Sequence, residues 1–168
     1  MGNTAQPDAH TATLVDSTAW ILGGCDDEDS AKDIYCLDTD TVGDIPPPFR
    51  AHTATLFDRK SLVFGGDLRS KYFDTVYLVD IPLRRWSKPH VEPGPKPPRR
   101  YHTANLVGSI MVVIGGSDGK DTFTEVWCLD LDKLIWTALT QSSGPVFPKR
   151  LAHSATKIGS FLFVMRGH

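Results

Sequence analysis

A segment of the His-Thr-Ala type occurs four times along the chain, and this repetition constrains the fold more than any other feature. The segments begin at His10, His52, His102 and His153, with Ser154 in place of threonine in the last. The successive histidines are therefore 42, 50 and 51 residues apart. Self-similarity at such a period indicates similar supersecondary units in series. The 168 residues suffice for one domain of ordinary size or for one piece of a larger domain.

Each of the first three units continues with an apolar run that ends in a pair of glycines. A tyrosine or tryptophan follows, with an aspartate three residues later, and in the second and third units a tryptophan comes nine positions after that aromatic residue. The fourth unit has Arg166 where the first glycine is expected. The repeat residues to which we assign a structural role are Gly23, Gly24, Tyr35, Gly65, Gly66, Tyr77, Trp86, Gly115, Gly116, Trp127 and Trp136.

The glycine pairs have a physical explanation in the backbone. Glycine tolerates positive φ and lets a neighbouring strand approach closely. A phosphate-cradling loop is the functional alternative, but it is disfavoured because acidic residues such as Asp67 follow the glycines. The aromatic residues are expected to pack between units.

Four short runs of strand-forming residues lie in each complete unit, separated by turn residues. In the second unit the runs are Ala51–Phe57, Ser61–Phe64, Thr75–Asp80 and Trp86–Lys88, joined alternately by short and long loops. No stretch has a sustained helical apolar period. The sequence therefore predicts an all-β chain in which four antiparallel strands form each unit.

The glycine pair, the later aromatic residue and the tryptophan after it resemble the kelch repeat of the β-propeller family, whose period of about 50 residues matches the later two intervals. The resemblance covers the chain from Ala9 onward and implies blades packed face to face around an axis. The predicted fold is a partial β-propeller of kelch type, with three four-stranded blades and the first two strands of a fourth. The predicted segments are a polar lead at 1–8, blade 1 at 9–49, blade 2 at 50–99, blade 3 at 100–150 and a truncated first half of blade 4 at 151–168.

Blade 1 departs from the repeat at its outer strand. Asp44 stands nine positions after Tyr35, where the next two blades have tryptophan. We expect its outer strand to shrink to Thr41–Asp44, before the prolines at 46–48, because proline suits a sheet edge.

Composition and charge exclude several classes of function. The formal net charge of −2 disfavours nucleic acid as a partner, and no apolar run approaches the about 18 residues of a membrane helix. Cys25, Cys36 and Cys128 lack metal-ligand spacing and favour free thiols in a reducing compartment, so we expect a cytoplasmic protein. We expect no cofactor and no metal. The repeated histidines occupy equivalent places in successive blades, cannot converge on one zinc ion, and are expected to satisfy polar groups between inner strands.

The long loops predict where a partner binds. Because strands alternate in direction, the loop after the second strand and the linker after the outer strand emerge on one face, the long-loop face, where binding residues concentrate. Its mixture of charge and aromatic side chains suits a protein–protein interface, and its basic clusters suit an acidic partner. The candidate partner-binding residues are Arg69, Tyr72, Phe73, His90, Lys96, Arg99, Arg100, Lys120, Phe123, Phe147, Lys149 and Arg150.

The resemblance implies a non-catalytic interaction scaffold that binds a protein partner, in cytoskeletal or cell-polarity organisation or in substrate capture for ubiquitin ligation. The chain is more similar to stand-alone or fungal polarity-type kelch proteins than to ligase adaptors. The alternative is an enzyme or metal-dependent specifier on a kelch propeller, with galactose-oxidase-like or iron-dependent activity. We also expect self-association through open ends, with Phe161–Val164 on one flank and Leu14, Trp20 and Leu22 on the other.

Overall fold

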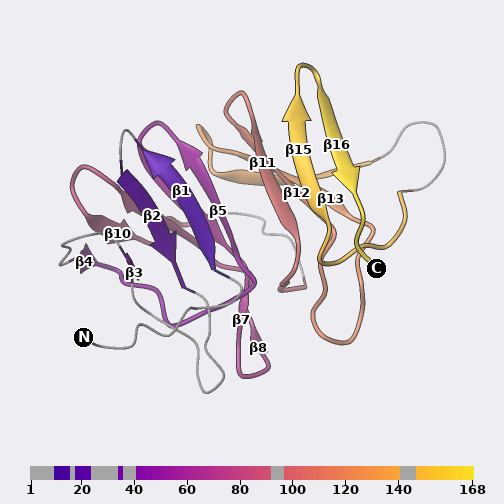
Figure 1. Ribbon diagram of the computed structural model, residues 1–168, viewed down its shortest axis with the longest axis horizontal. Helices are drawn as coiled ribbons and strands as arrows, with labels where there is room; N and C mark the ends of the chain where they lie inside the picture. The colour runs from indigo at the N-terminus through magenta and orange to yellow at the C-terminus, as the bar shows by residue number, and fades with distance from the viewer. Residues whose placement is uncertain (1–9, 16–17, 24–33, 36–40, 92–96, 141–146) are drawn as a thin grey trace.

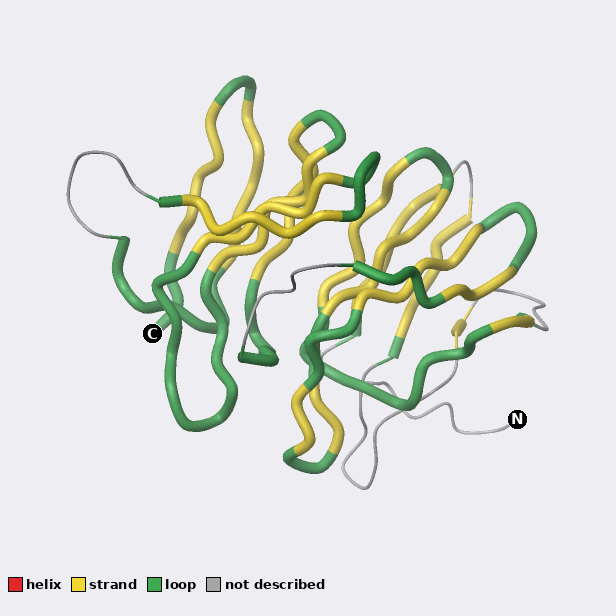
Figure 2. Tube along the Cα trace, turned by 180° about the vertical axis from the view of Figure 1, so that it is seen from behind, coloured by secondary structure: helices red, strands yellow, loops and turns green. Residues whose placement is uncertain are grey.

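The computed structural model describes residues 10–15, 18–23, 34–35, 41–91, 97–140 and 147–168. Every regular element among these residues is a β-strand, which confirms the all-β class. Successive blades stand side by side in chain order, from the N-terminal strands to the C-terminal hairpin (Figures 1 and 2). This arrangement is a partial β-propeller.

Blade 1 is a three-stranded sheet in the described residues. It consists of β1 (Thr11–Val15), β2 (Thr18–Leu22) and β3 (Ile34–Tyr35), paired in that order and antiparallel. β1 and β2 join in full register, with Thr11 opposite Leu22.

Blades 2 and 3 each contain four antiparallel strands from their own repeat. Blade 2 consists of β5 (Thr53–Phe57), β6 (Lys60–Phe64), β9 (Val76–Asp80) and β10 (Arg85–Ser87). These bounds lie within two residues of the predicted ones. Blade 3 consists of β11 (Thr103–Val107), β12 (Ile110–Ile114), β13 (Val126–Asp130) and β14 (Ile135–Leu139).

Two hairpins complete the described strands. β7 (Asp67–Leu68) and β8 (Lys71–Tyr72) form a two-residue hairpin that projects from blade 2, and β15 (Ser154–Ile158) and β16 (Phe161–Met165) form the first half of blade 4. The inner strands of blades 1 to 4, which are β1, β5, β11 and β15, lie next to each other in series. The exact residues at which one blade ends and the next begins stay predictions.

The outer strand predicted for blade 1 belongs to blade 2, so this prediction is wrong. β4 (Val42–Gly43) runs parallel to β10, with Val42 N donating to Arg84 O at 3.1 Å and Asp44 N to Trp86 O at 3.1 Å. Gly43 has a φ of 96°, and a Cβ built on it would lie 2.1 Å from Trp86 O. Glycine at this position therefore permits the backbone approach that attaches the segment to its neighbour.

The core lies between blades because alternate side chains of a strand point to opposite neighbours. Leu62 and Phe64 of blade 2 pack with Met111 and Trp136 of blade 3 in one buried cluster. Trp136 is 1% exposed, and its ring lies 5.1 Å from that of Phe64.

The blade 1–2 interface corrects one prediction. Trp20 and Leu22 are 6% and 2% exposed, although the sequence predicted that they lie on an open flank. They point from blade 1 toward blade 2, where Trp20 packs with Ile81 and Leu22 packs in a cluster with Trp86. These two side chains therefore lie in the blade 1–2 interface, and the side chain of Leu14, the third residue of that prediction, lies outside the described part.

Histidines link the inner strands in a repeating pattern. His52 Nε2 lies 2.9 Å from Thr11 Oγ1, and His102 Nε2 lies 2.9 Å from Thr53 Oγ1 in the preceding blade. His153 contacts Thr103 Oγ1 in the same way at 2.8 Å. These contacts are the polar links between inner strands that the repeat led us to expect. Burial lowers the pKa of both His52 and His102 to about 3, so both are neutral near pH 7.

Candidate functional site

The described long loops gather on one face of the molecule. The β7–β8 hairpin projects there, and the linkers that lead into β5, β11 and β15 approach from the same side (Figure 1). The tight turns between first and second strands lie at the opposite end in the same view. The long-loop face therefore has the geometry that strand alternation predicts.

Glycine pairs let each linker cross the blade before it. Gly65 and Gly66 have φ values of 69° and 93°, and Gly66 N donates to Arg99 O at 2.8 Å. A Cβ on Gly65 would lie 2.6 Å from Arg99 O and 2.6 Å from a ring carbon of His102. Gly115 has the same role against the carbonyl of Arg150. Gly23 and Gly116 also have positive φ, whereas Gly24 and the side chain of Tyr35 lie outside the described residues.

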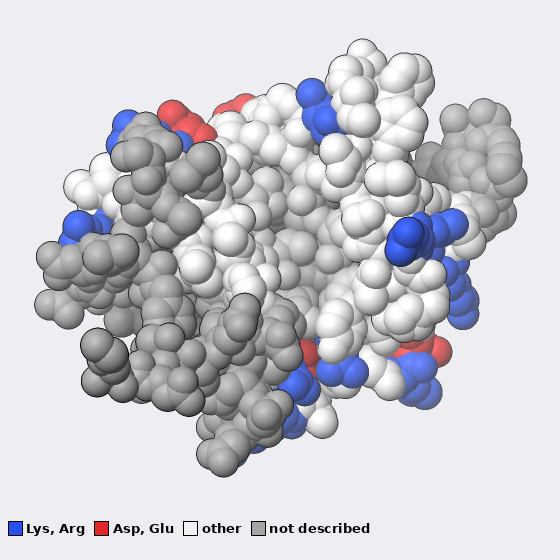
Figure 3. Space-filling model, viewed as in Figure 1, with Lys and Arg blue, Asp and Glu red and all other residues white. Residues whose placement is uncertain are grey.

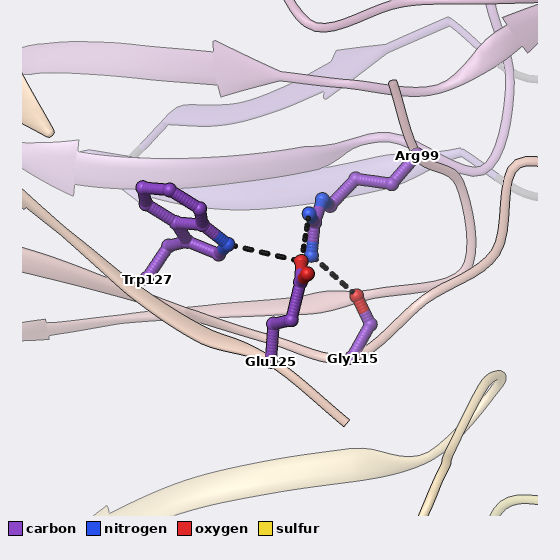
Figure 4. Close-up of polar contacts among 4 residues, drawn as sticks. All are labelled: Arg99, Gly115, Glu125 and Trp127. Carbon is purple, nitrogen blue, oxygen red and sulfur yellow. Dashed lines mark hydrogen bonds and ion pairs between the residues drawn. The ribbon is translucent and has the colours of Figure 1, made fainter. Parts of the chain in front are cut away.

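Arg99 is the buried centre of the blade 2–3 linker (Figure 4). Its Nη1 donates to Gly115 O at 3.0 Å, and its Nη2 donates to Glu125 Oε2 at 3.1 Å. Trp127 Nε1 donates to the same carboxylate oxygen at 3.1 Å, and the guanidinium lies 4.8 Å from the ring of Phe123. Burial lowers the pKa of Arg99, while the hydrogen bond and charge of Glu125 oppose that shift.

This network overturns two predicted binding residues. The side chain of Arg99 is 0% exposed, and Phe123 is 8% exposed beneath it. A partner on the surface does not reach either side chain. The doubled arginine at 99–100 indicated a basic surface, but the first of the two points inward because the linker backbone is held by Gly66 and Phe73. Both residues support the face rather than form it.

Arg100 lies on the face and connects two blades. Its Nη1 donates to Asp67 Oδ2 at 3.3 Å, and its guanidinium lies 5.1 Å from the ring of Tyr72 and 4.9 Å from that of Tyr101. Asp67 is 0% exposed and also pairs with Arg50 Nε at 3.5 Å. A buried carboxylate between two arginines fixes both in place, because leaving it unpaired would be costly.

Sequence reasoning missed Asp67, Arg50 and Tyr101. The sequence did contain a signal for Asp67 and Arg50. An acid directly follows the second glycine pair, and Arg50 and Arg100 each stand two positions before a repeat histidine. Equivalent positions in successive repeats lie side by side, so Asp67 can contact the arginine of its own blade and that of the next. No sequence signal placed Tyr101 over Arg100.

The exposed part of the face surrounds this network. Arg69 and Ser70 form the tip of the β7–β8 hairpin with φ of 44° and 71°, and Lys71 stands 5.8 Å from the ring of Phe73. Lys120 is exposed in the loop after β12. In this loop Asp118 Oδ1 accepts hydrogen bonds from the backbone N–H groups of Asp121 and Lys120. These hydrogen bonds, that from Asp121 foremost, lower the pKa of Asp118.

The other predicted residues differ in exposure. Tyr72 and Phe73 are half-buried, and Arg150 stacks 5.9 Å from the ring of half-buried Phe147. Lys149 and His90 are exposed. Lys96 lies outside the described residues.

Basic residues outnumber acids on the described part of this face. Segments 49–51, 65–74, 97–101, 115–125, 147–152 and 166–168 contain nine arginines and lysines and five aspartates and glutamates, with Arg99 and Asp67 among them buried, although the whole chain has a net charge of −2. Two of the five acids, Asp67 and Glu125, are engaged by arginines. Figure 3 shows more basic than acidic atoms along the lower edge, where the β7–β8 hairpin lies in Figure 1.

Three further features bear on the predictions made from the sequence. Within the described ranges, no group of three or more His, Cys, Asp or Glu side chains could hold a metal ion. Cys128 is a half-buried free cysteine with a pKa raised by burial, while Cys25 and Cys36 lie outside the described part. No helix in the residues described is long and apolar enough to cross a membrane.

Comparison with known proteins supports the repeat assignment. The model of the KLHDC2/KLHL20/DRC7 Kelch-repeats domain matches residues 40–167. Acyl-CoA-binding domain-containing proteins 4 and 5 of Arabidopsis thaliana are 34% identical over 89 residues and 33% identical over 94 residues. These matches cover 47% and 50% of this chain but only 13% and 14% of those proteins. With a family model over most of its length and the β-sheet blades that the repeat predicts, the chain belongs to the kelch-repeat family, whose domains generally act as protein–protein interaction scaffolds.

Proposed function

We propose that this chain is a non-catalytic scaffold whose long-loop face binds an acidic segment of a protein partner. The observation that carries the proposal is the basic and aromatic surface around Arg100, whose guanidinium lies 5.1 Å from the ring of Tyr72 and 4.9 Å from that of Tyr101. Asp67 fixes that guanidinium in advance, so an approaching carboxylate meets a preorganised donor array.

Exposed lysines supply the long-range part of the attraction. Lys71, Lys120 and Lys149 are all exposed and come from three different loops of the face. Charges of this kind raise the association rate and select the sign of the partner's charge more than they add affinity. The aromatic rings supply apolar contact beside them, as in many protein interfaces.

The biological setting is a further part of the proposal. The resemblance to stand-alone kelch proteins supports a cytoplasmic partner in cytoskeletal or cell-polarity organisation. The fold by itself is compatible with many functions, so this part rests on family analogy.

The test is a pair of matched triple variants in a capture experiment from native-cell extract. Lys71, Lys120 and Lys149 are changed to glutamate on the long-loop face. In the control, Arg59, Lys133 and Lys157, which are exposed elsewhere, are changed to glutamate. All six positions are exposed, so both variants are expected to keep the unfolding temperature of the original chain.

The proposal predicts that partner proteins identified by mass spectrometry are lost from the long-loop variant and retained by the control. Capture by the original chain should also weaken as salt rises from about 0.15 M to about 0.5 M. Equal capture by both variants, or loss in the control alone, would move the binding site to another face.

A further inference from the structure

Arg50, Asp67 and Arg100 form a charged set on the long-loop face. Asp67 is 0% exposed, and its Oδ2 lies 3.5 Å from Nε of Arg50 and 3.3 Å from Nη1 of Arg100. Both guanidiniums therefore lie beside a single oxygen atom, one from the linker into β5 and the other from the linker into β11. The set has positive charge in excess, because two guanidiniums meet one carboxylate.

The backbone crossing at this place does not depend on the charged set. Arg50 and Asp67 exchange two backbone hydrogen bonds, of 3.1 Å and 3.0 Å. One blade later, Arg100 and Ser117 exchange the same pair, of 2.9 Å and 3.0 Å. Blade 3 thus makes the crossing with a serine in place of the carboxylate and with Leu151 in place of the second arginine. The crossing therefore does not explain why blade 2 has two arginines around a buried carboxylate.

Arg100 keeps hydrogen-bond donors for a ligand. Its Nη1 donates to Asp67, whereas its Nη2 donates to no group in the described part of the chain. The rings of Tyr72 and Tyr101, 5.1 Å and 4.9 Å from the guanidinium, restrict its movement. The side chain of Arg100 is 24% exposed and that of Arg50 is 37% exposed, so both reach the surface. An arginine held in this way suits an anion with several oxygen atoms.

Two exposed lysines lie on the loops that meet beside Arg100. Lys71 precedes Tyr72 on the β7–β8 hairpin, and Lys120 follows Gly119 in the loop after β12. The two loops are in contact, because a Cβ on Gly119 would overlap Tyr72 Oη. Cations from two successive blades therefore gather in one region of the face.

We propose that these residues bind the phosphoryl group of a phosphoserine or phosphothreonine in the partner segment. The set, called the arginine site, consists of Arg50, Asp67, Lys71, Arg100 and Lys120. This inference rests on the proposed function, which places an acidic partner on the same face, and it identifies the acid. A phosphoryl group has a charge of about −1.5 to −2 at pH 7 and three strong acceptor oxygens. It can therefore pair with an arginine and with lysines at once, whereas a carboxylate has one charge and two oxygens.

Asp67 prepares the arginine site before a partner binds. Its buried carboxylate orients both guanidiniums, so less side-chain freedom is lost when the phosphoryl group arrives. The partial exposure of Arg50 and Arg100 favours a phosphate on a short side chain. Serine and threonine bring the phosphoryl group close to the partner backbone, which then lies across the face.

The test uses three peptide libraries of random sequence around a fixed central residue, which is phosphoserine, glutamate or serine. All carry the same fluorophore, and the fraction retained on the immobilised 168-residue chain is measured by fluorescence. We expect the phosphoserine library to be retained about tenfold more than the glutamate library, with the serine library retained least.

The libraries separate this inference from the proposed function. Equal retention of the phosphoserine and glutamate libraries, both above serine, would overturn the phosphoryl proposal and leave an acidic partner in place. Retention of none above the serine level would overturn both. Displacement of the phosphoserine library by inorganic phosphate at the peptide concentration would also overturn the inference, because such a site would bind the free anion without a partner segment.

Variants locate the binding on the protein. Arg100→Lys keeps the charge but loses the planar fork, so the preference for phosphoserine over glutamate should fall about tenfold. Lys120→Gln, at an exposed position, should lower retention of the phosphoserine library about threefold without an effect on folding. Arg85→Lys, at an exposed position at the start of β10, is the control and should change neither value.

The unfolding temperature of each variant shows whether it folds. A folded Arg100→Lys chain that keeps the full preference for phosphoserine would overturn the proposal. An equal loss of preference in Arg85→Lys would do the same, because the arginine site would then not be the place where the phosphoryl group binds.

Discussion

Two successive blade interfaces differ in how deeply their side chains are buried, although these side chains occupy equivalent positions of the repeat. Between blades 2 and 3, Leu62, Phe64 and Val76 are at most 2% exposed against the side chains of blade 3. Between blades 3 and 4, only the inner end is buried and Leu139 is 61% exposed. A repeat sequence therefore specifies which residues are equivalent, and the neighbour that packs on them decides how much each contributes to stability.

The largest expected difference is between two adjacent residues of β14. Trp136→Ala should lower the free energy of unfolding by about 3–5 kcal/mol, because its ring fills the blade 2–3 interface. Ile135→Ala, at 45% exposure on the open side of the same strand, should cost less than about 1 kcal/mol. Chemical denaturation of both variants measures the difference. Equal losses would show that the two sides of blade 3 are equally packed.

Arginines at the same repeat position sharpen the comparison. Arg99→Met removes a buried guanidinium that bonds Glu125 and Gly115 and should cost about 3 kcal/mol. Arg150 is half-buried and donates to Arg166 O, so Arg150→Met should cost less than about 1 kcal/mol. Thermal unfolding compares the two. A larger loss at Arg150 would contradict the assignment of the buried network to the blade 2–3 linker.

Two glycines with the same φ separate backbone strain from contact. Gly108 and Gly115 both have a φ of 61°, but only a Cβ on Gly115 meets other atoms, 2.5 Å from Arg150 O. Gly108→Ala should cost about 1 kcal/mol from backbone strain. Gly115→Ala should cost about 2 kcal/mol more, because the linker must move. If the two losses agree in equilibrium unfolding, the close crossing of the linker is not important for stability.

The histidine links predict a loss of stability in mild acid. The folded-state pKa of His52 and His102 is about 3, below the unfolded value of 6.5, so the unfolded chain binds protons first as pH falls. Stability present above pH 6.5 should decline toward pH 3, by about 2 kcal/mol per histidine at pH 5. Denaturation at pH 7.5 and 5 measures this decline. His102→Gln should reduce it by about half, and an unchanged decline would contradict buried neutral histidine.

Much of the fold follows from the repeat. The four strands of blade 2, the positive φ of Gly65 and Gly115 and the polar links of the histidines all follow from what strand-forming residues, glycine and histidine do at regular spacing. The repeat could not show in which direction individual side chains point. Arg99 and Arg100 are neighbours in sequence, yet one is buried and one lies on the face, because hydrogen bonds of the linker backbone set which way each points.

The sequence also did not show which blade a given strand or side chain contacts. The segment β4 was expected in blade 1 but pairs with β10, because a two-residue strand carries too little pattern to indicate its partner. Trp20 and Leu22 were expected on an open flank, because periodicity shows that a side is apolar without showing which blade it meets. Asp67 of the candidate site was missed because its position in the sequence does not show that its carboxylate pairs with arginines of two successive blades.

Burial between blades, rather than repeat identity, sets the local stability of each blade. Amide hydrogen exchange across the chain tests it most directly, since protection reports the free energy of local opening. We expect the slowest exchange in β6, β9, β12 and β13 around the blade 2–3 interface, and exchange at least about tenfold faster in β15 and β16. Equal protection of β15–β16 and β11–β12 would contradict it.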